Sequence, residues 1–192
     1  MTIFLILAPF GSFALLMLVA SAPVALFVSA AVCLAVIAFD LVRGRQVKML
    51  GAGSVVLFGA LGAYIVWVDP GLSSSAIKLT VDAGVLAISL ASIGLRFPFT
   101  LQYAREMVDT ETAGLPGFIK ANYIISWAWA GAFAAMAAAN VLMIYGPDLP
   151  LWAGVVIAFA ARNTAMYFTK WYPDYCKAKY GPLPGSKALS GI

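Results

Sequence analysis

Charged side chains are rare inside the apolar stretches of this chain, and those few are the residues that could do chemistry. Four of them stand out: Asp40, Lys78, Asp82 and Arg162. A charge placed in hydrocarbon costs about 3 kcal/mol or more, so an ionisable residue there needs a partner or a function. We therefore treat these four positions as candidates for ion handling, ligand binding or structural ion pairs.

Spacing and depth suggest partners for these charges. Lys78 and Asp82 are four residues apart and share one face of a helix, so we expect a structural ion pair near one membrane surface. Ion or proton handling by Asp82 is the alternative. Arg162 lies near the middle of the last apolar stretch, and we expect it to clamp two helices together by contacting Asp40, with Arg43 as a rival partner. A site for an anionic lipid or substrate at Arg162 is the alternative there.

Amide side chains add weaker candidates, while the usual catalytic motifs are absent. Asn122, Asn140 and Asn163 lie in apolar stretches, where hydrogen bonds between helices contribute about 1 kcal/mol or less each. The chain has no histidine, and its two cysteines form no CxxC pair. We therefore expect no metal site, no other cofactor and no disulfide framework. No hydrolase, P-loop or zinc-protease motif is present, so an enzyme acting on lipid-linked substrates is only a third hypothesis.

The apolar stretches that must position these residues predict the fold class. Of 192 residues, 63% are hydrophobic and 10% are charged, whereas soluble domains carry about 25% charged residues. A span of about 20 apolar residues crosses the bilayer core. We therefore predict an all-α polytopic transmembrane bundle of about six spans, forming one domain over residues 1–169, with a basic cytoplasmic tail at 170–192. The predicted spans are Thr2–Ala20, Pro23–Val42, Met49–Val68, Ala76–Leu95, Ala121–Tyr145 and Leu149–Thr169.

The distribution of basic residues predicts the orientation. The connections after the second and fourth spans, together with the tail, carry ten of the twelve Lys and Arg residues. The positive-inside rule then places both termini in the cytoplasm of a multi-pass plasma-membrane protein. The formal charge of +4 is explained by topology and by anionic lipid head groups, so we expect membrane lipids, not nucleic acid, as partners.

The connection between the fourth and fifth spans predicts a short amphipathic helix in the cytoplasmic interface. From Thr100, apolar residues recur three and four positions apart, at Leu101, Ala104 and Val108. We expect this segment to be either a docking surface for other proteins or an inert connection. Its candidate contact residues are Arg96, Gln102, Arg105, Glu106 and Asp109.

Small residues four positions apart occur in two predicted spans. Gly59 and Ala63 form one such pair, and Gly131, Ala135 and Ala139 form a series. Small side chains let helix backbones approach closely in lipid. We expect these faces to pack inside the bundle, with a homodimer interface as the alternative.

A series of short motifs carries a family resemblance. These motifs are Arg43-Gly44-Arg45-Gln46-Val47-Lys48-Met49, Lys78-Leu79-Thr80-Val81, Arg96-Phe97-Pro98-Phe99, Lys120-Ala121-Asn122, Trp127-Ala128-Trp129 and Ala139-Asn140. In this order, over residues 30 to 145, the chain resembles the bacterial inner-membrane family of intracellular septation protein A. The resemblance implies a role in cell-envelope synthesis or division through contacts with other inner-membrane proteins. It also implies that Lys78, Arg96, Lys120 and Asn122 matter for the fold or for contacts.

Two function classes follow from these observations. The first is a non-enzymatic interaction protein of the bacterial inner membrane, as the resemblance and the missing catalytic motifs suggest. The second is a transporter or channel for ions or small solutes, in which Asp82 and Arg162 line a polar path between two inverted halves of three spans.

Overall fold

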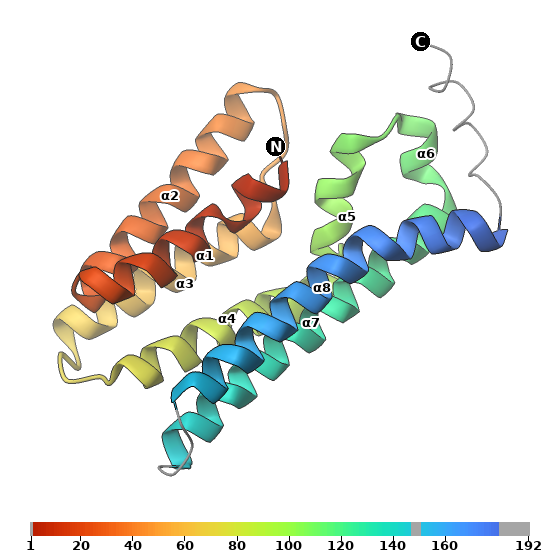
Figure 1. Cartoon of the computed structure of the whole chain (residues 1–192). Helices are drawn as coiled ribbons and strands as arrows, with labels where there is room; N and C mark the ends of the chain where they lie inside the picture. Colours follow the sequence, from red (N-terminus) through yellow and green to blue (C-terminus); the bar gives the residue numbers. More distant parts are fainter. Residues whose placement is uncertain (1, 147–150, 181–192) are drawn as a thin grey trace.

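The computed structural model describes residues 2–146 and 151–180, and this part of the chain contains helices and connections only. The predicted all-helical architecture is therefore confirmed. Figure 1 shows the order of the elements. They are α1 (Thr2–Val19), α2 (Ala22–Val42), α3 (Met49–Trp67), α4 (Ser74–Gly94), α5 (Phe99–Ala104), the 3-10 turn η1 (Arg105–Met107), α6 (Thr110–Gly114), α7 (Pro116–Tyr145) and α8 (Leu151–Tyr180).

Within the described residues, four helices are long and apolar enough to cross a membrane, namely α2, α3, α4 and α7. The shortest, α3, has 19 residues and reaches about 28 Å at 1.5 Å per residue, close to the thickness of the bilayer core. The chain is therefore a membrane protein. Four of the six predicted spans meet this criterion, whereas α1 contributes a shorter apolar segment, Ala8–Val19, and α8 is not in the group.

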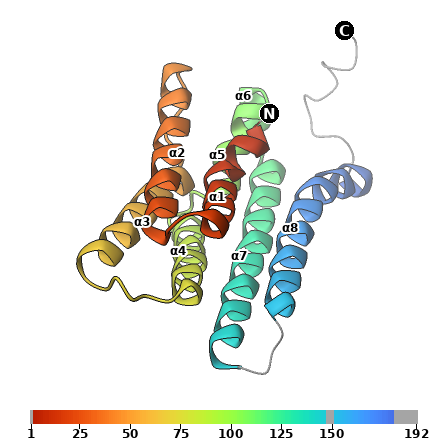
Figure 2. The ribbon, with the colours of Figure 1, turned by 60° about the vertical axis from the view of Figure 1, so that its left-hand side comes forward.

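The long helices form two groups that meet at α3 and α4. In the first group, α2 packs against both α1 and α3; in the second, α7 packs against both α4 and α8. Figure 2 shows α7 and α8 running side by side, with α4 on the other side of α7. Within the second group, the indole Nε1 of Trp129 in α7 donates a hydrogen bond to Thr169 Oγ1 in α8 at 2.9 Å.

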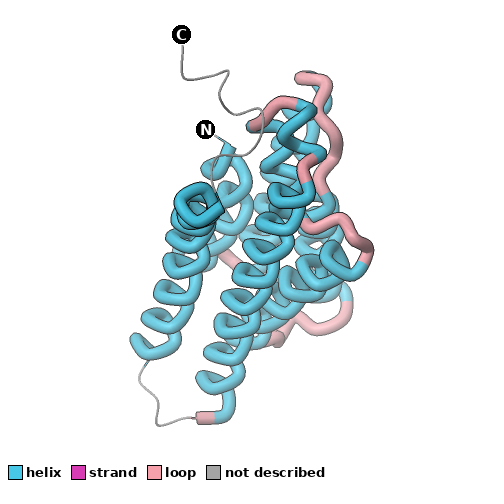
Figure 3. Tube along the Cα trace, turned by 90° about the vertical axis from the view of Figure 1, so that its right-hand side faces the viewer, coloured by secondary structure: helices cyan, strands magenta, loops and turns pink. Residues whose placement is uncertain are grey.

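One end of the molecule carries the longer connections. We call α5, η1 and α6 together the elbow, and the end of the bundle where it lies the elbow end. Figure 3 shows the elbow and the N-terminus at the same end, while short connections lie at the other. The turn between α3 and α4, residues 68–73, belongs to that opposite end.

The core lies mainly among α2, α3 and α4, and α1 and α5 each add one buried residue, Phe13 and Phe99. Phe58 is fully buried, with its ring centroid 5.8 Å from that of Phe10 and 5.5 Å from that of Phe13. Of the small residues predicted to pack inside the bundle, Ala139 is buried, whereas Gly59 and Gly131 make no close helix contact. A Cβ atom at Gly84 would overlap Leu57 across the α3–α4 contact, whereas one at Gly59 or Gly131 would meet nothing within 4 Å.

The elbow is shorter and more broken than the predicted amphipathic helix. The helix that begins at Phe99 ends at Ala104, and Val108 is extended, with φ −131° and ψ 163°. Asp109 then caps α6, because its Oδ1 accepts a hydrogen bond from Thr112 N at 2.7 Å. This cap lets a new helix start where the pattern suggested one continuous helix.

Two helices are longer than the predicted spans. The helix of the fifth predicted span, α7, begins at Pro116. Proline suits the first turn of a helix because the N–H that it lacks would have no partner there. The last continues past Thr169 to Tyr180. With 30 residues each, α7 and α8 are about 45 Å long, which exceeds the thickness of the bilayer core, so α7 as a span extends beyond it.

Candidate functional site

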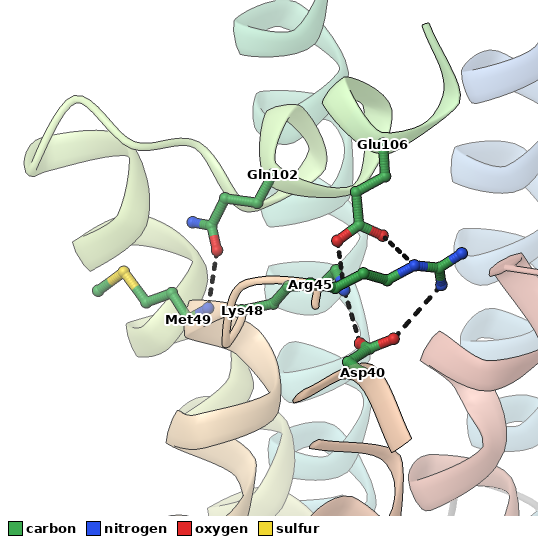
Figure 4. A network of polar contacts seen from close by, with 6 residues as sticks. All are labelled: Asp40, Arg45, Lys48, Met49, Gln102 and Glu106. Carbon is green, nitrogen blue, oxygen red and sulfur yellow. Dashed lines mark hydrogen bonds and ion pairs between the residues drawn. The ribbon is translucent and has the colours of Figure 1, made fainter. Parts of the chain in front are cut away.

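Four charged side chains form a network between the α2–α3 connection and the elbow (Figure 4). Lys48 Nζ lies 2.6 Å from Asp40 Oδ2 and 2.9 Å from Glu106 Oε1. Arg45 lies 3.4 Å from Asp40 Oδ1 and 3.7 Å from Glu106 Oε2. Each carboxylate therefore faces both cations, and the network has no net charge. We call Asp40, Arg45, Lys48 and Glu106 the charge network.

The end of α2 brings the first three of these residues together. Gly44 has φ +70°, a left-handed conformation that glycine adopts without strain. Its N–H donates to Leu41 O at 2.9 Å, and Arg45 N donates to Asp40 O, also at 2.9 Å. This pair of bonds is the Schellman motif, which closes a helix and reverses the chain. The reversal returns Arg45 and Lys48 to the side chain of Asp40.

Burial makes the charge network energetically significant. The side chains of Lys48 and Asp40 are 6% and 11% exposed, whereas that of Arg45 is 32% exposed. Lys48 Nζ also lies 5.2 Å from the centroid of the Tyr103 ring, which adds a cation–π contact. Burial, followed by the nearby Asp40 carboxylate, raises the pKa of Tyr103 above the ordinary value of a tyrosine.

Gln102 forms a second connection between the same elements. Its Oε1 accepts a hydrogen bond from Met49 N, the first residue of α3, at 2.7 Å, and its Nε2 donates to Phe97 O at 2.9 Å. The amide thus ties the start of α3 to the segment that follows α4. The elbow is therefore held to the bundle by the charge network and by this amide bridge.

A separate polar contact lies between α4 and α7. Asn140 Nδ2 donates a hydrogen bond to Asp82 Oδ2 at 2.7 Å, and Asp82 is partly buried. The predicted ion pair of Lys78 with Asp82 is not among the ion pairs within 4.0 Å in the described chain, and Lys78 is exposed. Because Lys78 lies at the start of α4, its chain can extend towards water, while Asp82 turns to the neighbouring helix.

The predicted contact of Asp40 with Arg162 is wrong, and so is the rival contact with Arg43. Asp40 pairs with Lys48 and Arg45, as described above. The Arg43 guanidinium lies over the Phe39 ring, 4.1 Å from its centroid. Arg162 is exposed on α8, with no ion pair or side-chain hydrogen bond to any described residue.

The other two amides bond within their own helices. Asn122 Nδ2 donates to Phe118 O at 2.9 Å, and Asn163 Nδ2 donates to Phe159 O at 2.7 Å. The carbonyl of Asn122 also accepts a hydrogen bond from Thr100 Oγ1 at 2.8 Å. Asn122 therefore lies where the elbow packs on α7, so its backbone, not its amide, makes the contact between elements.

The five predicted contact residues of the elbow divide into two sets. Gln102 and Glu106 are used in the intramolecular contacts above, and Asp109 caps α6. Arg96 and Arg105 are exposed, and the Arg105 guanidinium lies 5.8 Å from the Phe97 ring centroid. Two exposed cations, one in the elbow and one just before it, therefore stand near the exposed Phe97 ring.

The roles of Arg45 and Lys48 were not predicted from the sequence. Both were counted as topological charges at the membrane surface, although they stand five and eight residues after Asp40 with Gly44 between them. A glycine after an apolar helix signals a helix end and a chain reversal. That signal could have paired Asp40 with its local cations.

The chemistry of these sites is structural and electrostatic. In residues 2–146 and 151–180, no three His, Cys, Asp or Glu side chains group as metal ligands would. Comparison with known proteins finds no matching family model, no matching curated protein and no matching solved structure. The function must therefore be argued from the contacts and surfaces of this chain alone.

Proposed function

We propose that this chain is a non-enzymatic protein of the bacterial inner membrane that supports envelope synthesis or division by contacting other membrane proteins through its elbow. The observation that carries the proposal is that the charge network fixes the elbow and leaves an apolar surface exposed. Met107 of the elbow is 66% exposed, and Phe97, two residues before the elbow, is 51% exposed. Exposed apolar side chains on an element that is held in place are typical of interaction sites. The motif resemblance to intracellular septation protein A supports the same class of function.

The proposal includes six spans with both termini in the cytoplasm. Five basic residues follow α2 or α4 or lie in the elbow, and Lys48 contacts Glu106 of the elbow, so we assign all of them to the elbow end: Arg43, Arg45, Lys48, Arg96 and Arg105. The positive-inside rule assigns that end to the cytoplasm. In this arrangement α1 and α8 are the first and sixth spans. In a variant in which the native cysteines are replaced by serine, a cysteine at Ser73 should react with an impermeant maleimide in intact cells. A cysteine at Met107 should react only after the cells are opened.

Photocrosslinking in living cells tests the interaction. A benzoylphenylalanine at Met107 should capture cell-wall synthesis or division proteins, while the same residue at Trp67, 79% exposed at the other end of α3, should not. Lys48→Met removes one cation of the charge network without changing the elbow surface, so it should weaken capture at Met107. Equal products at both positions, or products unchanged by Lys48→Met, would contradict the proposal.

Transport is a second candidate, favoured by one observation. Asp82 carries a charge inside α4, and its hydrogen-bond partner is the neutral Asn140 of α7. A carboxyl group inside a span that forms no ion pair within 4.0 Å in the described chain is a candidate for an ion or proton pathway. Proteoliposomes of the purified chain should then take up protons or cations faster than empty liposomes, and Asp82→Asn should remove the difference. Equal uptake by both kinds of liposome would exclude this function.

A further inference from the structure

The outer surface between α3 and α4 is hollowed at the elbow end. A shallow, wide-open and almost entirely apolar groove of about 480 Å³ lies there. It runs from Met49 to Val56 along α3, about 10 Å at 1.5 Å per residue. Because both helices are membrane spans by length and composition, the groove opens to the hydrocarbon of the bilayer. Its walls include Met49, Ala52 and Val56 of α3 and Ala87 and Ala91 of α4.

The mouth of the groove lies against the elbow. Gln102 joins Met49, which lines the groove, to Phe97, which follows α4. Phe97 directly follows Arg96, and its ring lies 5.8 Å from the Arg105 guanidinium. Two exposed arginines therefore stand where the groove reaches the membrane surface. Neither has a carboxylate within 4.0 Å among the described residues, because Glu106 is used by the charge network.

Arg96 occupies a backbone position that suits glycine. Its φ is +60°, its N–H donates to Ile93 O at 3.0 Å, and Phe97 N donates to Ser92 O at 2.9 Å. These bonds form the same Schellman motif that ends α2, where the corresponding residue is Gly44. The backbone of Arg96 is kept in a left-handed conformation although its side chain makes no protein contact, which indicates a ligand outside the chain.

We propose that the groove and its mouth bind one anionic phospholipid, with an acyl chain between α3 and α4 and the head-group phosphate on Arg96 and Arg105. A flexible acyl chain suits a shallow, apolar groove at hydrocarbon depth. Guanidinium groups form bidentate hydrogen bonds with phosphate oxygens, and their charge favours an anionic head group over a zwitterionic one. This site does not depend on the partner proposed for the elbow.

Lipid titration by native mass spectrometry tests the head-group site. The purified full chain should bind phosphatidylglycerol more tightly than phosphatidylcholine with the same acyl chains. Each basic residue near a membrane contributes about a fivefold preference for anionic lipid, so we expect roughly 25-fold for the pair. Arg96→Gly combined with Arg105→Gln should remove this preference. The matched control, Arg43→Gln combined with Lys120→Gln, removes two exposed charges away from the groove and should preserve it.

Two further measurements distinguish a bound lipid from general surface charge. Arg96→Gly relieves the left-handed strain, so it should raise the melting temperature while it weakens phosphatidylglycerol binding, whereas a purely structural arginine would not give opposite changes. Ala91→Phe, or the smaller Ala87→Leu, should fill the groove and weaken the binding of both phosphatidylglycerol and phosphatidylcholine. Ala138→Phe, on the exposed face of α7, should leave the binding of both lipids unchanged. An unchanged preference without the two arginines, or unchanged binding with the groove filled, would overturn the proposal.

Discussion

Replacement of Lys48 by methionine should destabilise the protein more than any other single change in the charge network. Methionine keeps an unbranched side chain of similar length but removes the cation that lies 2.6 Å from Asp40 and 2.9 Å from Glu106. Two carboxylates would then share the longer and more exposed contacts with Arg45. Loss of one partner from a fully buried pair costs about 3–5 kcal/mol, and exposed pairs contribute about 0–1 kcal/mol. Because the carboxylate side chains are 11% and 20% exposed, we expect a loss of about 2–4 kcal/mol for Lys48→Met.

The assay is reversible unfolding in mixed detergent micelles, followed by circular dichroism at increasing mole fraction of dodecyl sulfate. Arg45→Met is the matched variant in the same network and should lower the unfolding free energy by about 1 kcal/mol or less, because its contacts are longer and more exposed. A double-mutant cycle with Asp40→Asn should show that the second change costs less once Lys48 has been replaced. Equal losses for Lys48→Met and Arg45→Met would refute the reasoning, since burial would then not decide the cost.

Three further predictions concern other contacts. Asn140→Leu removes the hydrogen-bond donor of Asp82 and should cost about 1–2 kcal/mol in the same unfolding assay, whereas Asp82→Asn, which keeps a hydrogen-bonding side chain, should cost less. Gly84→Ala forces apart α3 and α4 and should lower the unfolding free energy by about 1 kcal/mol or more, while Gly131→Ala, with open space around it, should leave it unchanged or raise it. The hydrogen bonds from Thr112 lower the pKa of Asp109. The stability that the ionised Asp109 gives to α6 is therefore present above the unfolded pKa and is lost as pH falls through the folded pKa. The protection of the first turn of α6 against hydrogen exchange, relative to the intrinsic rate at each pH, should fall below about pH 4, and Asp109→Ala should lower this protection at every pH.

The apolar pattern predicted the middle spans closely. The expected span Pro23–Val42 corresponds to α2 (Ala22–Val42), and Met49–Val68 corresponds to α3 (Met49–Trp67). This part of the fold follows from transfer free energy, which each residue contributes independently of its neighbours in space. The ends of these helices can also be predicted from the nearby sequence, because turn residues and charges interrupt the apolar pattern there.

The partners of the polar residues could not be predicted in the same way. Depth along a straight span assigned Asp40 to the membrane and suggested Arg162 as its partner, but the chain reversal at Gly44 supplies a nearer cation. The contact of Lys48 with Glu106 joins residues far apart in sequence, and it depends on how the elbow packs against α2 and α3. Contacts of this kind are set by tertiary packing, which sequence spacing within one helix does not encode.

Arg162 separates the two proposed functions. Most polar side chains in the long helices are used within the described chain, as in the bond from Asn140 to Asp82 and the bond from Trp129 to Thr169. If α8 is the sixth span, Arg162 lies eleven residues from its first residue, about 16 Å into the membrane, with its charge exposed. An exposed charge at that depth is costly unless a carboxylate or water reaches it. A carboxylate from another protein would extend the interaction surface from the elbow to α8, whereas water around Arg162 would favour a transport path, so the environment of this residue bears on both proposals.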